Sequence, residues 1–393
     1  MFHRLKVLLI LSLISICASF LASFGHRSCV SRIHLSNVAD HSNPRRVWYS
    51  DSSVSRSDIP TVDTSTLFVS KFILVGQGST YLTKISQTRA DPIVLSFEDV
   101  VKLIGNELMQ SLISSFQPNS DNRAGDQLLA WIGKRNQVNY WCLHLPFKTE
   151  YLMQSIQQAD PEVMVMPLRE FGDLLEDPSE AAIYGTANAI TEFHRTHAFC
   201  SLCGSTTAIR NAGTSRICSN HKSKGGDCQS SSIYPRIDVA SIMLITSPCE
   251  QYALLGRKKS WPEGRYSTLA GFLEVGETIE ECCIRETFEE SGVKVDPSSI
   301  RFIQSQPWPF PRSLMVGFRA KAAKDDVTEL PAIRFDEKEM EHVAWFDKQF
   351  VASRLTGGST ALTYNPSENE KKFHIPGKAS LARVLITEWA LEQ

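Results

Sequence analysis

The sequence has little net charge, few cysteines for its length, and neither an internal repeat nor a long low-complexity tract. Its 393 residues carry a formal net charge of −2, which argues against a surface that coats nucleic acid without selectivity. Ten cysteines in a chain of this length are too few for a fold held together by disulfides. With 42% hydrophobic and 21% charged residues the chain can bury a core, and its length predicts two or three domains.

Charge is also missing from residues 7–24, directly after the basic residues His3, Arg4 and Lys6. A basic start, an apolar run and a stretch of small residues are typical of a cleaved secretory signal peptide. The apolar run is long enough that an uncleaved membrane anchor is the alternative. We therefore assign residues 1–24 to a signal peptide or anchor.

Lysine and glutamate are absent from residues 25–60, which contain nine serines and five arginines. This composition is typical of a disordered, transit-like segment, and a plain linker is the alternative. The Ala-Ser-Phe tripeptides that end at Phe20 and Phe24 resemble the bipartite leaders of algae with complex plastids. We expect delivery to an organelle through the secretory route, with a plastid as the destination and the endoplasmic reticulum, secretion or a membrane anchor as alternatives.

Residue patterns predict two regions of mixed α/β structure separated by a cysteine cluster. In the first, which we place at residues 63–195, strands are expected at 66–75 and 140–145 and helices at 97–116 and 178–199. In the second, which we place at residues 233–393, strands are expected at 237–247, 251–259, 316–320 and 343–346, with a closing helix at 379–391.

The cysteine cluster contains Cys200, Cys203, Cys218 and Cys228. A Cys-x2-Cys pair followed by two further ligands is typical of a structural zinc site, in which the metal fixes geometry and performs no chemistry. Because Cys228 comes later than a second pair usually places it, His221 is the rival fourth ligand, although we prefer Cys228. Two thiol pairs or disulfides are the alternative to zinc. The pattern predicts a zinc ribbon at residues 196–232.

One helix near the middle of the second region concentrates negative charge. Thr278 and Glu281 form a capping box at its start, and Gly292 can adopt the left-handed conformation at its end. One face carries three carboxylates at i, i+3 and i+4, namely Glu286, Glu289 and Glu290. Like charges repel at this spacing, whereas binding a divalent cation through oxygen would offset the repulsion. Arg285 can hold one of these carboxylates by a bidentate pair.

These residues resemble the Nudix box, Gly-x5-Glu-x7-Arg-Glu-apolar-x-Glu-Glu-x-Gly-apolar. The matching residues are Gly271, Glu277, Arg285, Glu286, Glu289, Glu290, Gly292 and Val293, and Thr287 stands where an aliphatic residue is usual. Four further segments, EFHRTHAFCSLCG, YPR, SQPWPFP and IPGKASLARVLI, are similar to the zinc-containing NADH pyrophosphatases. That resemblance runs from about residue 65 to the C-terminus.

The resemblance implies an α/β (α+β) fold with an N-terminal Nudix-like domain, a zinc ribbon and a C-terminal catalytic Nudix α/β/α sandwich with a mixed sheet. It implies a homodimer that uses Mg²⁺ or Mn²⁺ to hydrolyse the pyrophosphate bond of NAD(H) to AMP and nicotinamide mononucleotide. Some members of the family also remove NAD caps from RNA. A Nudix hydrolase of another nucleotide diphosphate, such as ADP-ribose, and a non-catalytic nucleotide sensor are the alternatives.

The resemblance also implies roles by position. The metal ligands would be the carbonyl of Ala270 together with Glu286, Glu289, Glu290 and Glu339. Glu290 is the preferred general base or key metal carboxylate, Glu289 is the alternative, and Arg285 is grouped with them as a catalytic residue. The substrate contacts would be Tyr234, Phe272, Gln306, Trp308, Phe310, Arg312, Ser313 and Ala382, with Tyr234 reaching across the dimer.

The segment SQPWPFPRS, residues 305–313, is stiffened by three prolines. We expect a rigid loop in which Trp308 and Phe310 form a wall of the dinucleotide pocket, and a merely structural loop is the alternative. Arg312 replaces a more usual Gln and would favour an extra phosphate, as in NADP(H) or capped RNA, or else point to solvent. Val239 after Asp238, where the family usually has Pro, is a further departure, as is the stretched zinc spacing.

Overall fold

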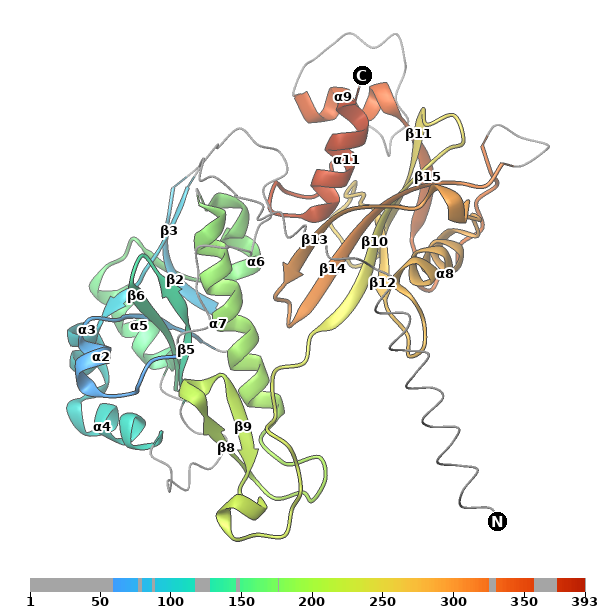
Figure 1. Ribbon diagram of the computed structural model, residues 1–393. Helices are drawn as coiled ribbons and strands as arrows, with labels where there is room; N and C mark the ends of the chain where they lie inside the picture. Colours follow the sequence, from blue (N-terminus) through green and yellow to red (C-terminus); the bar gives the residue numbers. More distant parts are fainter. Residues whose placement is uncertain are drawn as a thin grey trace, which may run out of the picture. The chain divides into compact units, whose positions relative to one another are not determined.

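The computed structural model describes residues 59–76, 80–86, 89–116, 128–145, 149–175, 177–324, 330–356 and 373–392 (Figure 1). All of these belong to one unit of the chain, residues 44–393. The predicted signal peptide and nearly all of the transit-like segment lie outside the described residues. No helix in the described ranges is long and apolar enough to cross a membrane.

The N-terminal region contains two small sheets. The four-stranded sheet has the order β4–β1–β6–β5, with strands Leu95–Ser96, Lys71–Leu74, Val138–His144 and Leu128–Arg135. The three-stranded sheet has the order β3–β2–β7, with strands Ala90–Pro92, Thr80–Ile85 and Val163–Pro167. The accompanying helices are α2 (Thr64–Phe68), α3 (Phe97–Ile104), α4 (Asn106–Ser114), α5 (Thr149–Ala159), α6 (Leu168–Phe171) and α7 (Pro178–Thr196).

Two expected elements of this region are divided in the structure. The strand predicted at 66–75 is wrong in its first half, where α2 forms because Asp63 Oδ1 accepts a hydrogen bond from Thr66 N (2.8 Å) and caps the helix. The helix predicted at 97–116 is interrupted at Gly105, whose φ of 84° lies outside the helical range and separates α3 from α4.

A two-stranded hairpin, β8 (Thr207–Arg210) and β9 (Ser215–Cys218), follows α7. Its Arg216 is 1% exposed and donates hydrogen bonds to Thr207 Oγ1 (2.6 Å), Thr207 O (2.8 Å) and His194 Nδ1 (2.6 Å). Burial lowers the pKa of His194 to about 3, so the ring is neutral and its Nε2–H donates to Gly213 O (2.7 Å). These contacts join the hairpin to the end of α7.

The C-terminal region is built on a six-stranded mixed sheet. Its order is β13–β14–β10–β11–β15, and β12 pairs with β10 beyond this path. The strands are Arg301–Trp308, Ser313–Lys321, Asp238–Thr246, Tyr252–Arg257 and His342–Asp347, with β12 at Leu269–Phe272. Strand β10 runs parallel to β14 and antiparallel to β11 and β12. The predicted mixed sheet is confirmed.

Alternate residues of β10 face two different helical layers. Met243 and Ile245 share a core with Cys283 of helix α8 (Ile279–Ser291). Ile242 and Leu244 share a second core with α9 (Lys348–Thr356) and α11 (Leu381–Leu391). Figure 1 shows α8 on one side of the sheet and α9 with α11 on the other. The layers form the α/β/α sandwich expected from the sequence.

The segment 305–313 is mostly strand and not the loop expected from its prolines. Its first residues extend β13, which pairs antiparallel with β14 so that Gln306 lies opposite Met315 and Trp308 opposite Ser313. Strand β13 is at the edge of the sheet, where Pro307 need not donate to a second neighbour. The turn itself is confined to the residues between Trp308 and Ser313.

Candidate active site and zinc ribbon

Helix α8 holds the predicted carboxylates beside β12. Its capping box is formed, since Glu281 N donates to Thr278 Oγ1 (3.2 Å) and Thr278 N donates to Glu281 Oε2 (2.8 Å). Gly292, with φ 71°, ends the helix. Glu290 is 3% exposed, whereas the side chain of Glu289 is 53% exposed, so the two neighbouring carboxylates lie in different environments.

Arg285 connects the carboxylates to one another. Its Nε donates to Glu277 Oε1 (2.8 Å), and its Nη1 contacts Glu286 Oε1 (2.9 Å) and Glu289 Oε2 (3.1 Å). Its Nη2 donates to the carbonyl of Phe272 (2.8 Å), which fixes the end of β12. The hydrogen bonds to Glu277 raise the pKa of Arg285, so this guanidinium remains a cation that orients the acidic groups.

Glu286 lies directly against Gly271. A Cβ added at Gly271 would be 1.8 Å from the carboxyl carbon of Glu286, so any side chain at this position would displace that carboxylate. The glycine of the sequence motif is therefore required by the close approach of an acid and not by a turn. Burial also raises the pKa of Glu286.

Glu290 accepts a hydrogen bond from Ala270 N to Oε2 (3.2 Å), and its Oε1 lies 3.2 Å from Lys258 Nζ. Burial raises the pKa of Glu290 despite the opposing effect of Lys258. Two desolvated carboxylates with incomplete charge compensation, Glu286 and Glu290, form a set of hard oxygen donors. The donor set and its burial fit a divalent cation.

Two of the other predicted ligands lie at the rim of this site. Glu289 is held by Arg285, and the exposed Glu339 lies in a turn that its own N–H closes by donating to Asp336 O (3.0 Å). The charges of Glu289 and Glu339 add to the effect of burial in raising the pKa of Glu286. Within the described ranges, the oxygen atoms of these carboxylates are not grouped as closely as the sulfur atoms of the four cysteines.

The sulfur atoms of Cys200, Cys203, Cys218 and Cys228 all lie within 4.8 Å of one another. Cys203 Sγ is 3.4 Å from Cys218 Sγ, Cys200 Sγ is 3.9 Å from Cys228 Sγ, and all four are free thiols. The rival ligand His221 instead accepts a hydrogen bond from Ser223 N at its Nδ1 (3.0 Å) and caps a short 3₁₀ turn, Lys222–Lys224. That turn lies between Cys218 and Cys228, accounts for part of the long spacing between them, and brings the chain back to place Cys228 beside the other cysteines. Four converging sulfurs fit a tetrahedral zinc ion.

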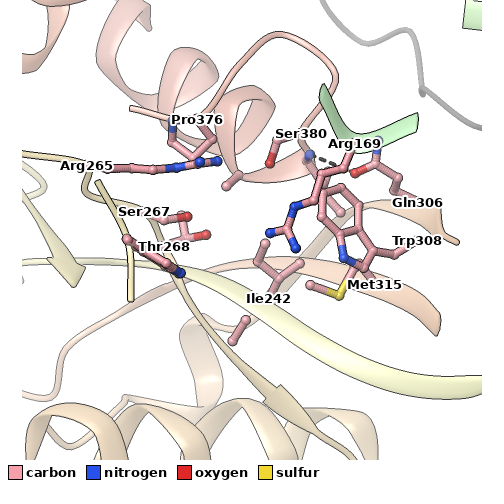
Figure 2. Close-up of a pocket in the computed structure, with 14 residues that line it drawn as sticks. Arg169, Ile242, Arg265, Ser267, Thr268, Gln306, Trp308, Met315, Pro376 and Ser380 are labelled. Carbon is pink, nitrogen blue, oxygen red and sulfur yellow. Dashed lines mark hydrogen bonds between the residues drawn. The ribbon is translucent and has the colours of Figure 1, made fainter. Parts of the chain in front are cut away.

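A cavity of about 170 Å³ is lined mainly by residues of the C-terminal region (Figure 2). Its apolar wall includes Ile242 of β10, Met315 of β14 and the ring of Trp308. Ala270 links the cavity to the acidic site, because it lines the cavity and its N–H donates to Glu290. The remaining lining residues are Arg169, Trp261, Arg265, Ser267, Thr268, Gln306, Pro376, Ser380, Leu381 and Ala382.

Comparison with known proteins agrees with this arrangement. Residues 235–359 match the NUDIX domain model, and residues 195–222 match the NADH pyrophosphatase zinc ribbon domain model. The chain is 36% identical over 240 residues to "NAD-capped RNA hydrolase NudC" of Mycobacterium bovis, covering 61% of this chain and 69% of that protein. It belongs to the zinc-ribbon NADH pyrophosphatase family of Nudix hydrolases.

A human relative of this Nudix hydrolase, "NAD-capped RNA hydrolase NUDT12", is 35% identical over 210 residues, which are 53% of this chain and 42% of the human protein. Among solved structures, a NUDIX hydrolase from Nitrosomonas europaea is 26% identical, with a TM-score of 0.29 over 38% of this chain and 78% of that one. The zinc ribbon match ends at residue 222, before Cys228.

Three of the substrate-contact residues predicted for this Nudix hydrolase line the cavity, namely Gln306, Trp308 and Ala382. Gln306 is 2% exposed, and its amide is engaged with backbone, because Nε2 donates to Ala379 O (2.9 Å) and Oε1 accepts from Leu381 N (2.8 Å). Its visible role is to hold the start of α11.

The other predicted contacts lie elsewhere. Phe310 packs against the core of the N-terminal region. Arg312 and Ser313 line a second cavity, of about 250 Å³, beside α7, where Arg312 Nη1 donates to Arg236 O (3.3 Å). Tyr234 and Phe272 are each 58% exposed and line neither cavity among those described.

Sequence reasoning missed three cations near the site: Lys258, Arg169 and Arg265. Lys258 follows strand β11 directly, so its position at a strand end next to a second lysine was a usable signal. Arg265 precedes the segment that leads into β12 and carries no motif of its own. Arg169 comes from α6 in the other region of the chain, and only the folded arrangement brings it to the cavity.

Proposed function

We propose that this Nudix hydrolase cleaves the central pyrophosphate bond of NAD(H), releasing AMP and nicotinamide mononucleotide, and cleaves the same bond in NAD-capped RNA. One observation carries the proposal: the buried carboxylates and the cavity lined by Trp308 meet at Ala270. A substrate with its pyrophosphate at the carboxylates can therefore place one nucleoside end in the cavity. The names of the mycobacterial and human relatives support the choice of substrate.

The catalytic cofactor we propose is Mg²⁺ or Mn²⁺, held by Glu286, Glu289, Glu290, Glu339 and the carbonyl of Ala270. Such ions neutralise a pyrophosphate and acidify a water molecule when they are bound. Arg285 keeps Glu286 and Glu289 oriented through its hydrogen bonds. We assign Glu290 to the base or key metal carboxylate, because its burial raises its pKa, and keep Glu289 as the alternative.

The cavity suits a flat ring. Trp308 offers an aromatic surface for stacking, and Ile242, Met315 and Ala382 add apolar contacts around it. Trp308 is itself held edge-on by Phe310, with ring centroids 5.1 Å apart. Phe310 thus supports the wall that the sequence led us to expect and does not line the cavity itself.

We also propose that the protein is a homodimer. Tyr234, Ile237 and Phe272 are more than half exposed, and a second copy would cover these apolar side chains.

The leader supports a further proposal, which is delivery to an organelle through the secretory route with a plastid as the destination.

Turnover of purified mature protein tests the function. With Mg²⁺ or Mn²⁺, NADH and NAD⁺ should yield AMP and the mononucleotide, separated by chromatography. Glu290→Gln should lower turnover by at least ~10² while the fold is retained. Glu280→Gln, an exposed acid in the first turn of the same helix, is the matched control and should remain active.

The outcomes distinguish the alternatives. Hydrolysis of ADP-ribose without hydrolysis of NAD(H) would show a different Nudix specificity. Binding of NADH with no turnover under either metal would indicate a nucleotide sensor. Full activity of a folded Glu290→Gln protein would remove Glu290 from the mechanism.

A further inference from the structure

Two guanidinium groups from different parts of the chain reach the cavity beside the carboxylates. Arg169 of α6 lies over the Trp308 ring, 5.9 Å from its centroid, and Arg265 lies over the Trp261 ring at 6.0 Å. Figure 2 shows both side chains extending toward the space between Trp308 and Pro376. None of the described lining residues is acidic, so the cavity wall carries two positive charges.

These charges are only partly compensated by their surroundings. Burial lowers the pKa of Arg265, and the charge of Arg169 lowers it further. The opposing carboxylate is Asp173, and its Oδ1 is already occupied by the backbone N–H of Ala379 (2.7 Å). Two neighbouring cations in a partly desolvated cavity are unfavourable unless an anion joins them.

The cavity also contains a buried hydroxyl that has no hydrogen-bond partner. Thr268 is 4% exposed, and within the described ranges its Oγ1 makes no hydrogen bond. A buried polar group is normally satisfied, so an unsatisfied one in a cavity wall is ready for a ligand atom. Thr268 and the two arginines line the same space.

We propose that Arg169 and Arg265 select dinucleotides that carry an extra anionic group on the nucleoside end bound in this cavity. The inference rests on the proposed function, which puts the pyrophosphate at Glu286 and Glu290 and one nucleoside end beyond Ala270. A ring stacked on Trp308 then places its substituents beside the guanidinium groups, which form strong charge-assisted hydrogen bonds with anions. The anion is either a carboxylate on the ring or a phosphate on the ribose.

Three dinucleotides that differ by one group test the proposal: NAD⁺, NADP⁺ and nicotinic acid adenine dinucleotide. NADP⁺ adds a ribose phosphate, and the nicotinic acid compound replaces the ring amide by a carboxylate. We expect at least one of the two anionic substrates to exceed NAD⁺ in kcat/KM by about tenfold with wild-type protein. The faster one identifies the source of the anion.

Arg265→Leu should abolish that preference, bringing the ratio of kcat/KM values near one. Arg169→Leu should act in the same direction, and Arg265→Lys should keep part of the preference because it keeps the charge. Arg301→Leu is the matched control, since it removes an exposed arginine of the same domain, and it should leave the ratio unchanged.

Equal kcat/KM for all three substrates with the wild-type protein would overturn the inference, and that result needs no variant to fold. An unchanged preference in a folded Arg265→Leu protein would overturn the role of this residue. Hydrolysis of none of the three would instead contradict the proposed function. In that case, calorimetry still decides with two pairs of mononucleotides: nicotinic acid mononucleotide against nicotinamide mononucleotide, and adenosine 2′,5′-bisphosphate against AMP. Tighter binding of the more anionic member of either pair supports the anion site, and equal binding within both pairs refutes it.

Discussion

Two glutamates of the acidic site are buried in surroundings that disfavour their ionised form until a cation binds. Glu286 and Glu290 have pKa values raised by burial from an ordinary value of 4.5, so the native state binds protons that the unfolded chain has released. Their contribution to stability is complete below the unfolded pKa and is lost as pH rises through the native pKa. At pH values above the native pKa, the metal-free protein carries the buried negative charges of Glu286 and Glu290.

This linkage predicts a pH-dependent stability difference. Metal-free wild-type protein should lose stability relative to Glu290→Gln as the pH rises from about 5 to about 8, because glutamine carries no charge to bury. Mn²⁺ should raise the melting temperature of the wild type more at the higher pH, where the carboxylates are ionised. Thermal unfolding of both proteins with and without Mn²⁺ measures this. Parallel curves for the two proteins would contradict it.

Gly271 gives a second prediction at this scale. Gly271→Ala should reduce turnover by at least ~10², because the new Cβ would displace the Glu286 carboxylate. Gly276→Ala is the control: its φ of 89° makes alanine strained there, by about 1–2 kcal/mol, yet nothing lies within 4 Å of the new Cβ. Kinetics and thermal unfolding together separate the two effects. A fully active Gly271→Ala enzyme would show that Glu286 need not lie against β12.

At the scale of elements, the zinc ribbon contains a short turn between Cys218 and Cys228, for which the usual, shorter spacing of two zinc ligands leaves no room. The Lys222–Lys224 turn uses the His221 ring as its cap and returns the chain to Cys228. Cys228→Ser should therefore lose the zinc, about one ion per chain, and lower the melting temperature, while His221→Ala should keep the metal. Elemental analysis of the purified variants decides between the two ligands, and zinc retained only by Cys228→Ser would reverse the assignment.

The edge strand and the closing helix are joined by one side chain. Gln306→Ala should destabilise the protein by about 1–3 kcal/mol, because Leu381 N and Ala379 O lose their partners in a buried place. Gln304→Ala, two residues earlier on the same strand, is the comparison. Denaturant unfolding gives the free energies. A large rise in KM for NADH with unchanged stability would instead favour the direct substrate contact that the sequence led us to expect.

Elements that depend on local chemistry were predictable from the sequence. The capping box and Gly292 determine where α8 begins and ends, and the spacing of Glu286, Glu289 and Glu290 determines that they share a face. The prolines of residues 305–313 were misleading, because local stiffness does not reveal that a segment lies at a sheet edge. The difference between Glu289 and Glu290 in burial likewise comes from packing against β12, which sequence spacing cannot report.

At the scale of the whole molecule, the catalytic domain does not complete its own cavity. Arg169 comes from the N-terminal region, Asp173 of the same region holds Ala379 at the approach to α11, and Asn188 of α7 donates to the carbonyl of Pro309. The sequence could predict a zinc ribbon followed by a Nudix domain, but not these contacts, because each joins residues far apart in the chain. The N-terminal region thus contributes directly to the shape and charge of the candidate site.

The leader makes a prediction for the intact chain. Residues 1–60 fused to a fluorescent protein should direct it into an organelle reached through the secretory membrane, and replacing Phe20 and Phe24 by Ala should hold it in the endoplasmic reticulum. Fluorescence microscopy in an alga with a complex plastid measures this. A cytosolic reporter with the unaltered leader would refute the targeting proposal.

The parallel pairing of β10 with β14 has a consequence for the order in which the molecule forms. The carboxylate helix and β13 lie between these two strands in the chain, so the centre of the sheet closes only after β14 has been synthesised. Long-range pairings of this kind form slowly, whereas domains near the N-terminus fold first during synthesis. A nascent chain that has already produced every residue of α8 therefore still lacks a working site. Its first hydrolytic turnover must wait until β14 and the later residues that line the cavity, such as Ala382, have emerged from the ribosome.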